Sequence, residues 1–205
     1  MMTVLRSLKR GLPLLIALSS VSCTSILSGP KSADIVYRLK SNTEAVMASE
    51  EAVIIRVDVP LSPRALRTTD ILVAPDSTQL ASLSGGQWSE VIPVLVQRAL
   101  VDKMAGSSKV VGVLPQSGAR TAYRVNIDIR SFEARFDQGE NAAPLAVVDY
   151  HVTVSDAMTR KLVGMHAVYK TQRADAARVS AIVAAQDMAN DDALEAIVVW
   201  LGELL

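Results

Sequence analysis

Residues 123–136, YRVNIDIRSFEARF, constrain the fold most, because apolar and polar side chains alternate along them. Alternation with a period of two predicts a β-strand with one buried face and one wet face, as in antiparallel sheets. The side chains predicted to face the core are Tyr123, Val125, Ile127 and Ile129. Those predicted to face away from it are Arg124, Asn126, Asp128 and Arg130.

Two further alternating stretches, 145–156 and 161–173, follow this strand, with a short turn around Met158-Thr159 between them. We expect 123–173 to form a three-stranded meander. Shorter strands are predicted at residues 34–40, 52–60, 70–75, 78–84 and 109–113. Of these, 70–75 and 78–84 are expected to pair as a hairpin.

Two helices are predicted, one from Trp88 to about residue 105 and one over 179–205. Gly85-Gly86 is expected to break the chain before the first helix, and Trp88 is expected to pack in the core. Pro93 is tolerable in a first helical turn, where no intrahelical N–H bond is lost. The sequence therefore predicts a single α+β domain, with an antiparallel or mixed sheet and both amphipathic helices packed on one face.

The first 22 residues have the order of a secretory signal peptide. Three cations, Arg6, Lys9 and Arg10, precede an apolar run from Leu12 to Leu18. This run is shorter than the roughly 20 apolar residues that a membrane-spanning helix needs. We therefore expect residues 1–22 to be cleaved.

Cys23 is the only cysteine, so it has no partner for an internal disulfide. A lone cysteine after an apolar run and a small residue resembles the bacterial lipobox, although Ser20 stands where that pattern usually has Leu. The resemblance implies lipidation at Cys23, and Thr24 in place of Asp resembles the outer-membrane sorting class. A plain secreted protein with an unpaired thiol is the alternative. Residues 23–33 are interpreted as a short tether.

Charge and motifs exclude several functions. Lys plus Arg and Asp plus Glu both number 21, so no basic surface for nucleic acid is indicated. No GxSxG, HExxH, CxxC, GxGxxG or P-loop pattern occurs. We therefore expect no enzymatic activity and no cofactor.

His151 and His166 are the only histidines, and they would lie opposite each other if the turn at Met158-Thr159 had two residues. A stable metal site needs three or four ligands, and only Asp149 is available beside them. No metal site is predicted.

The polar side of 123–136 is interpreted as either a solvated face or a partner face, and charge reversal at Arg124 and Arg130 is expected to leave the fold intact.

Several strings, YRL (37–39), VIIRVDVP (53–60) and ALRTTDILVAPDSTQLASLSGGQW (65–88), resemble the ABC-type transport auxiliary lipoproteins. This family accompanies MCE-type lipid transporters and includes the lipoprotein of the paraquat-inducible system. The resemblance covers nearly all of residues 34–205.

The resemblance implies a non-enzymatic accessory, lipid-anchored on the periplasmic side of the outer membrane, that docks the transporter assembly there. Its implied partners are an MCE-domain protein and an inner-membrane ABC transporter, and a homo-oligomer is left open. We expect the partner to bind protein surface, through Arg124, Asn126, Asp128 and Arg130, rather than through a lipid pocket. A stand-alone structural or assembly lipoprotein of the envelope is the alternative.

Lipidation can be tested by fractionating cells that produce Cys23→Ala. Without the acylated side chain, the protein should move from the membrane fraction to the soluble periplasm, because acyl chains supply the stable anchor. A variant that still sediments with membranes would place the anchor elsewhere.

Overall fold

The computed structural model describes residues 35–40, 43–76 and 78–205. Cys23, Thr24, the signal peptide and the tether lie outside the described residues, so what the sequence indicates for them stays a prediction. Within the described residues, no helix is both long and apolar enough to cross a membrane.

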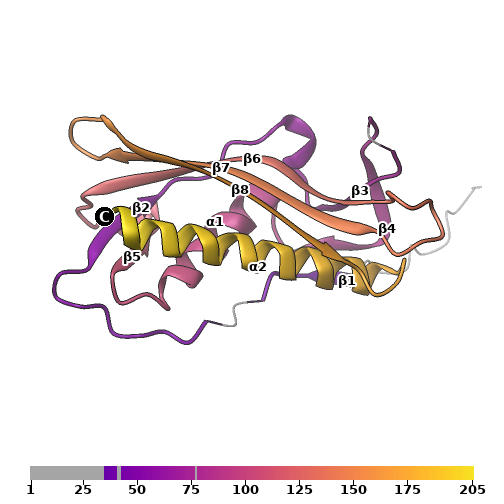
Figure 1. Ribbon diagram of the computed structural model, residues 1–205, viewed down its shortest axis with the longest axis horizontal. Helices are drawn as coiled ribbons and strands as arrows, with labels where there is room; N and C mark the ends of the chain where they lie inside the picture. The colour runs from indigo at the N-terminus through magenta and orange to yellow at the C-terminus, as the bar shows by residue number, and fades with distance from the viewer. Residues whose placement is uncertain (1–34, 41–42, 77) are drawn as a thin grey trace, which may run out of the picture. The chain divides into compact units, whose positions relative to one another are not determined.

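The described chain folds as a single α+β domain with eight strands in one mixed sheet and two α-helices, which confirms the predicted class (Figure 1). Two short 3-10 helices, Arg64–Leu66 and Pro115–Ser117, lie in connections. The elements in chain order are β1 (Ile35–Tyr37), β2 (Val53–Val57), β3 (Asp70–Ala74), β4 (Ala81–Trp88), α1 (Ile92–Met104), β5 (Val110–Val113), β6 (Tyr123–Arg135), β7 (Leu145–Asp156), β8 (Leu162–Arg173) and α2 (Val179–Leu204).

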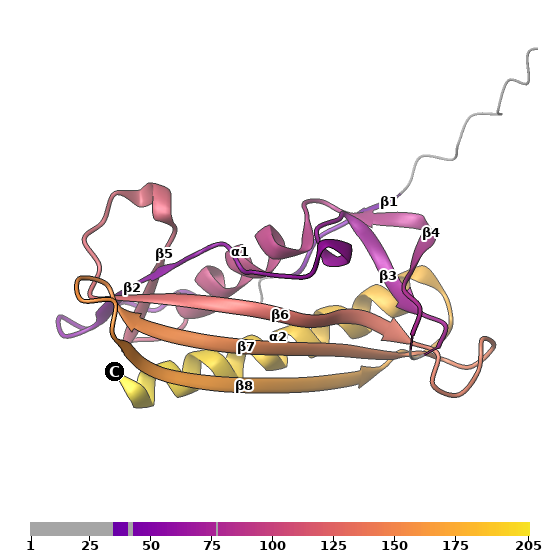
Figure 2. The ribbon, with the colours of Figure 1, turned by 90° about the horizontal axis from the view of Figure 1, so that it is seen from above.

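Strand β6 pairs along both of its edges. One edge forms a long antiparallel ladder with β7, which in turn pairs with β8 (Figure 2). The other edge is shared: β2 pairs in parallel with the start of β6, and β3 pairs in parallel with its end. β5 extends the sheet from β2, and β4 and β1 extend it from β3. The predicted meander over 123–173 is therefore confirmed.

The core lies against the face of the sheet that the alternation predicts. Val125, Ile127 and Ile129 of β6 are fully or almost fully buried. Their neighbours on β7 that were predicted to point inward are buried as well: Ala146, Val148, Tyr150, Val152 and Val154. Helix α2 contacts β7 and β8 and also contacts α1. That both helices pack on one face of the sheet stays a prediction.

The start of the first helix differs from the prediction. Gly85 and Gly86 lie inside β4, which runs on to Trp88, and α1 begins only at Ile92. The strand continues through Gly86 because β1 packs closely against β4 there. A side chain at this position would not fit, since a Cβ on Gly86 would lie 2.6 Å from Cε2 of Tyr37. Glycine here lets two strands meet rather than ending one. Pro93 does lie in the first turn of α1, as expected.

Trp88 packs in the core, as the sequence predicts. Its side chain is 1% exposed, and its ring meets Phe132 of β6 edge-to-face, with centroids 5.8 Å apart. This geometry is a favoured one for aromatic pairs. Trp88 therefore joins the end of β4 to β6.

Helix α2 is joined to the sheet by a buried hydrogen bond as well as by apolar contacts. The Tyr150 hydroxyl donates to Oδ1 of Asn190 at 2.7 Å, and both residues are buried. Burial raises the pKa of Tyr150 well above its usual value, so the hydroxyl remains a neutral donor.

Removing this hydroxyl should destabilise the domain. Tyr150→Phe leaves the buried Asn190 oxygen without its donor, which costs about 1–3 kcal/mol of unfolding free energy. Urea denaturation provides the measurement. Tyr169→Phe on β8, where the side chain is 57% exposed, is the matched control and should unfold like the wild type. Equal stability of the two variants would mean that the bond does not stabilise the fold.

Candidate partner-docking face

Arg124, Asn126 and Asp128 lie on the sheet face opposite the buried residues of β6, as predicted. Their cross-strand neighbours on β7 are Ser155, Thr153 and His151, respectively. We call the surface that these six side chains form the open face. It also includes Arg56 and Asp58 at one end, and Arg130, Ser131, Glu133 and Arg135 further along β6.

At the start of the open face, one carboxylate holds two arginines. Arg56 of β2 and Arg124 of β6 are direct neighbours across the parallel ladder, a repulsive arrangement for two like charges. Asp58 lies between them: Oδ1 accepts from Arg56 Nε at 2.8 Å, and Oδ2 accepts from Arg124 Nη2 at 2.7 Å and Nε at 3.0 Å. The Asp58 side chain is only 13% exposed. Arg124 therefore belongs to a structural ion-pair cluster, which sequence reasoning missed because Asp58 is far away in the chain.

A β-bulge about halfway along β6 shifts by one residue which positions of the strand point to the open face. The register with β7 shifts between Ile129 and Ser131, so Arg130 is the extra residue. Its side chain is 54% exposed and pairs with Asp128 at 2.8 Å. An exposed pair of this kind contributes little to stability. Arg130 is thus the predicted cation that remains most available to a partner.

Beyond the bulge, the open face continues with a second network that sequence reasoning also missed. Glu133 is buried: Oε1 accepts from Arg135 Nη2 at 2.7 Å, and Oε2 accepts from the Phe132 backbone N–H at 2.9 Å. Arg135 Nη2 also donates to Ser131 Oγ at 3.1 Å. Ser131, Glu133 and Arg135 are alternate residues in the sequence, and this spacing could have indicated that the three polar side chains share one face.

These side chains form one wall of a cavity of about 350 Å³. The opposite walls come from the first 3-10 helix and from the β3–β4 connection, and they are partly apolar. The lining residues are Pro63, Ala65, Leu66, Ala74, Asp76, Thr78, Gln79, Leu80, Arg130, Ser131, Glu133 and Arg135. A hollow with an arginine at its rim and an apolar wall suits a partner side chain that combines an apolar stem with an acceptor group.

The two histidines do not face each other. His151 is paired with Ala167, and His166 is paired with Val152. Five residues, 157–161, connect β7 and β8, and the register shifts between Val154 and Ser155, so the two-residue turn that would have set the histidines opposite each other does not form. His151 therefore lies on the open face, whereas His166 lies on the helix side, where its ring stacks on Trp200 with centroids 5.0 Å apart. Over residues 35–40, 43–76 and 78–205, no group of three or more metal-ligating side chains comes together.

Fold and open face together define an α+β domain in which a long meander presents a charged, hollowed sheet surface. The sequence profile of the family described as "ABC-type transport auxiliary lipoprotein component" matches residues 37–198. The chain belongs to this family, and the resemblance seen in the sequence is confirmed at that level.

Solved structures agree on the fold. A protein of Xanthomonas campestris is 17% identical with a TM-score of 0.70, over 82% of this chain and 95% of that protein. A second structure, of an uncharacterized protein, is 11% identical with a TM-score of 0.65, over 82% of this chain and 98% of that one. A search of curated protein sequences found no significant match.

Because Arg124 belongs to the Asp58 cluster, we now expect its charge reversal to destabilise the fold, whereas the sequence alone predicted no effect. Arg124→Glu places a second carboxylate beside Asp58 and removes two charge-assisted hydrogen bonds, so unfolding free energy should fall by about 1–3 kcal/mol. Arg130→Glu, in an exposed pair, should change it by less than about 0.5 kcal/mol. Urea unfolding of both variants tests this. An Arg124 variant as stable as the Arg130 variant would contradict a structural role for the cluster.

Proposed function

We propose that this chain is a periplasmic accessory lipoprotein of an MCE-type lipid transporter, and that its open face docks the MCE-domain protein at the outer membrane. In this proposal Cys23 carries the lipid anchor, Thr24 directs sorting, and an inner-membrane ABC transporter completes the assembly. The domain contributes binding rather than catalysis. The observation that carries the proposal is the family match over 37–198, which makes the protein an auxiliary component of ABC-type transport.

The proposal requires the helices to share the other side of the sheet. We propose that α1 and α2 both cover the face that bears Val125, Ile127 and Ile129, which leaves the open face free. Support comes from the contacts between the two helices and from the joint core that residues of both helices form with β6 and β7.

The chemistry of the open face suits a partner that binds and releases. Non-obligate interfaces are about as polar as ordinary protein surface, and arginine is enriched in them. The Asp58 cluster holds its two arginines in fixed positions, so little side-chain entropy is lost there when a partner binds. Arg130 and the neighbouring cavity offer the site where a partner side chain could be anchored.

Docking can be tested with Arg130→Glu, which should leave the fold intact. We expect the soluble domain with this substitution to bind the MCE-domain protein encoded beside the transporter genes about tenfold more weakly, equivalent to about 1.4 kcal/mol. Surface plasmon resonance provides the affinity.

Arg98→Glu is the matched control, because Arg98 is 59% exposed and also has a single surface ion pair, with Glu90 at 3.1 Å. This variant on α1 should bind like the wild type. Equal weakening by both substitutions would reject the open face as the docking site. Failure of the wild-type domain to bind any MCE-domain protein would favour a stand-alone envelope lipoprotein instead.

A further inference from the structure

Strand β8 is a long edge of the sheet. Among residues 35–40, 43–76 and 78–205 it pairs only with β7, although it runs for 12 residues. Every second residue of such an edge strand directs its backbone N–H and C=O away from the sheet. Proteins usually protect edges with charges or prolines, yet the stretch from Val163 to Tyr169 contains neither. The outer edge of β8 is therefore open to an added strand.

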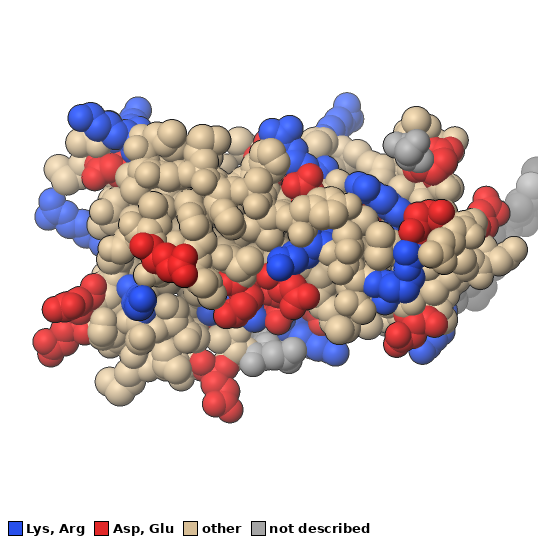
Figure 3. Space-filling model, in the orientation of Figure 1, with Lys and Arg blue, Asp and Glu red and all other residues tan. Residues whose placement is uncertain are grey.

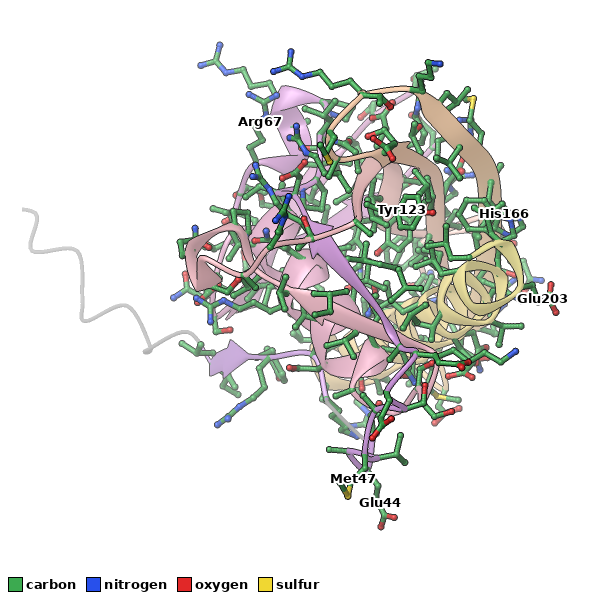
Figure 4. The ribbon with its side chains drawn as sticks, turned by 90° about the vertical axis from the view of Figure 1, so that its left-hand side faces the viewer. Glu44, Met47, Arg67, Tyr123, His166 and Glu203 are labelled. Carbon is green, nitrogen blue, oxygen red and sulfur yellow. The ribbon has the colours of Figure 1, made fainter. Side chains whose placement is uncertain are left out.

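A groove of about 590 Å³ runs beside this edge, between β8 and α2. Its base is built by His166 and Trp200, whose rings stack at an angle of 16°. Val199 of α2 is 51% exposed at its side. Figure 4 shows His166 next to the coil of α2, with Glu203 on the same side of the molecule. An added strand would direct alternate side chains into this groove, because side chains alternate between the faces of a sheet.

The rim of the groove is acidic. Asp192, Glu195 and Glu203 line it, against one lysine, Lys170. Glu195 shares Lys103 with Asp191, at 3.6 Å and 2.6 Å, so Asp192 and Glu203 supply most of the uncompensated negative charge. Figure 3 shows acidic side chains gathered over α2. A basic partner would be attracted to this rim.

We propose that β8 and the β8–α2 groove bind an extended, basic segment of a partner protein by strand addition. Backbone hydrogen bonds to β8 would supply affinity, and lysines or arginines of the segment would meet Asp192 and Glu203. A second copy of this chain, paired symmetrically through β8, fits less well. A symmetric dimer through β8 would bring the same acidic rim from each copy together, and like charges repel. This site is separate from the open face and does not depend on docking there.

The proposal can be tested with end-capped, fluorescently labelled peptides and the soluble domain at low ionic strength. The probe is TKTKLKTKT, which has strand-like alternation and positive charge. The peptide TETELETET reverses the charge, and TKPKLKPKT keeps the charge but cannot donate its full set of backbone hydrogen bonds. Fluorescence anisotropy gives the affinities, and amide hydrogen exchange locates the bound peptide.

We expect the first peptide to bind at least about tenfold more tightly than either control and to slow amide exchange in residues 163–170. The double variant Asp192→Lys with Glu203→Lys should reverse the charge preference. Glu44→Lys with Glu140→Lys changes the same number of exposed charges away from the groove and should leave the preference unchanged; Figure 4 shows Glu44 apart from Glu203.

Any of four results would overturn the proposal. Equal binding of the proline peptide would mean charge attraction without strand addition. No binding of the first peptide at millimolar concentration, or protection away from β8, would reject the site. Slowed exchange in residues 163–170 that depends on protein concentration alone would assign the edge to a second copy.

Discussion

The structure depends on the hydrogen-bonded ladders along both edges of β6. One edge is occupied by β7, and the other is divided between β2 near Tyr123–Val125 and β3 at Ala134–Arg135. Between these two contacts the chain after β2 continues beside β6, where the Leu61 N–H donates to the Ile127 carbonyl and the Leu61 carbonyl accepts from the Ile129 N–H, both at 2.8 Å. A single strand therefore organises the sheet, and its alternation sets the core and the open face together.

The bulge in β6 separates two kinds of charge on that face. Before it, Asp58 is satisfied by Arg56 and Arg124 and is largely shielded from water, so this cluster stabilises the sheet. At the bulge, Arg130 projects from the surface beside the cavity. Bulges commonly redirect a side chain, and here the redirected one is an arginine at the rim of a hollow. The same strand thus carries a structural ion-pair cluster and, at the bulge, an exposed arginine whose only ion pair within the described residues is a surface one with Asp128.

Two surfaces of the domain have different chemistry. The open face offers fixed arginines, whereas the groove beside β8 has an acidic rim over stacked aromatic rings. Surfaces that differ in this way allow one small domain to favour a different partner at each, because a basic ligand suits the acidic rim, whereas the charges of the open face are already paired with one another. For an auxiliary component of a transport system, such separation would allow contact with more than one protein.

The sequence by itself determined the meander, the inward residues of β6 and β7, the long C-terminal helix and the position of Pro93, because each depends on local periodicity or on one backbone constraint. It also placed Arg124, Asn126 and Asp128 on one face. Only the tertiary structure decided the path of β4 through Gly85-Gly86, since that path requires Tyr37 to pack against a glycine. It likewise decided the register of His151 and His166 and the pairing of Arg124 with Asp58. These features depend on turn length, a bulge and parallel strand contacts between distant residues, and local alternation carries no information about which distant strand will lie alongside.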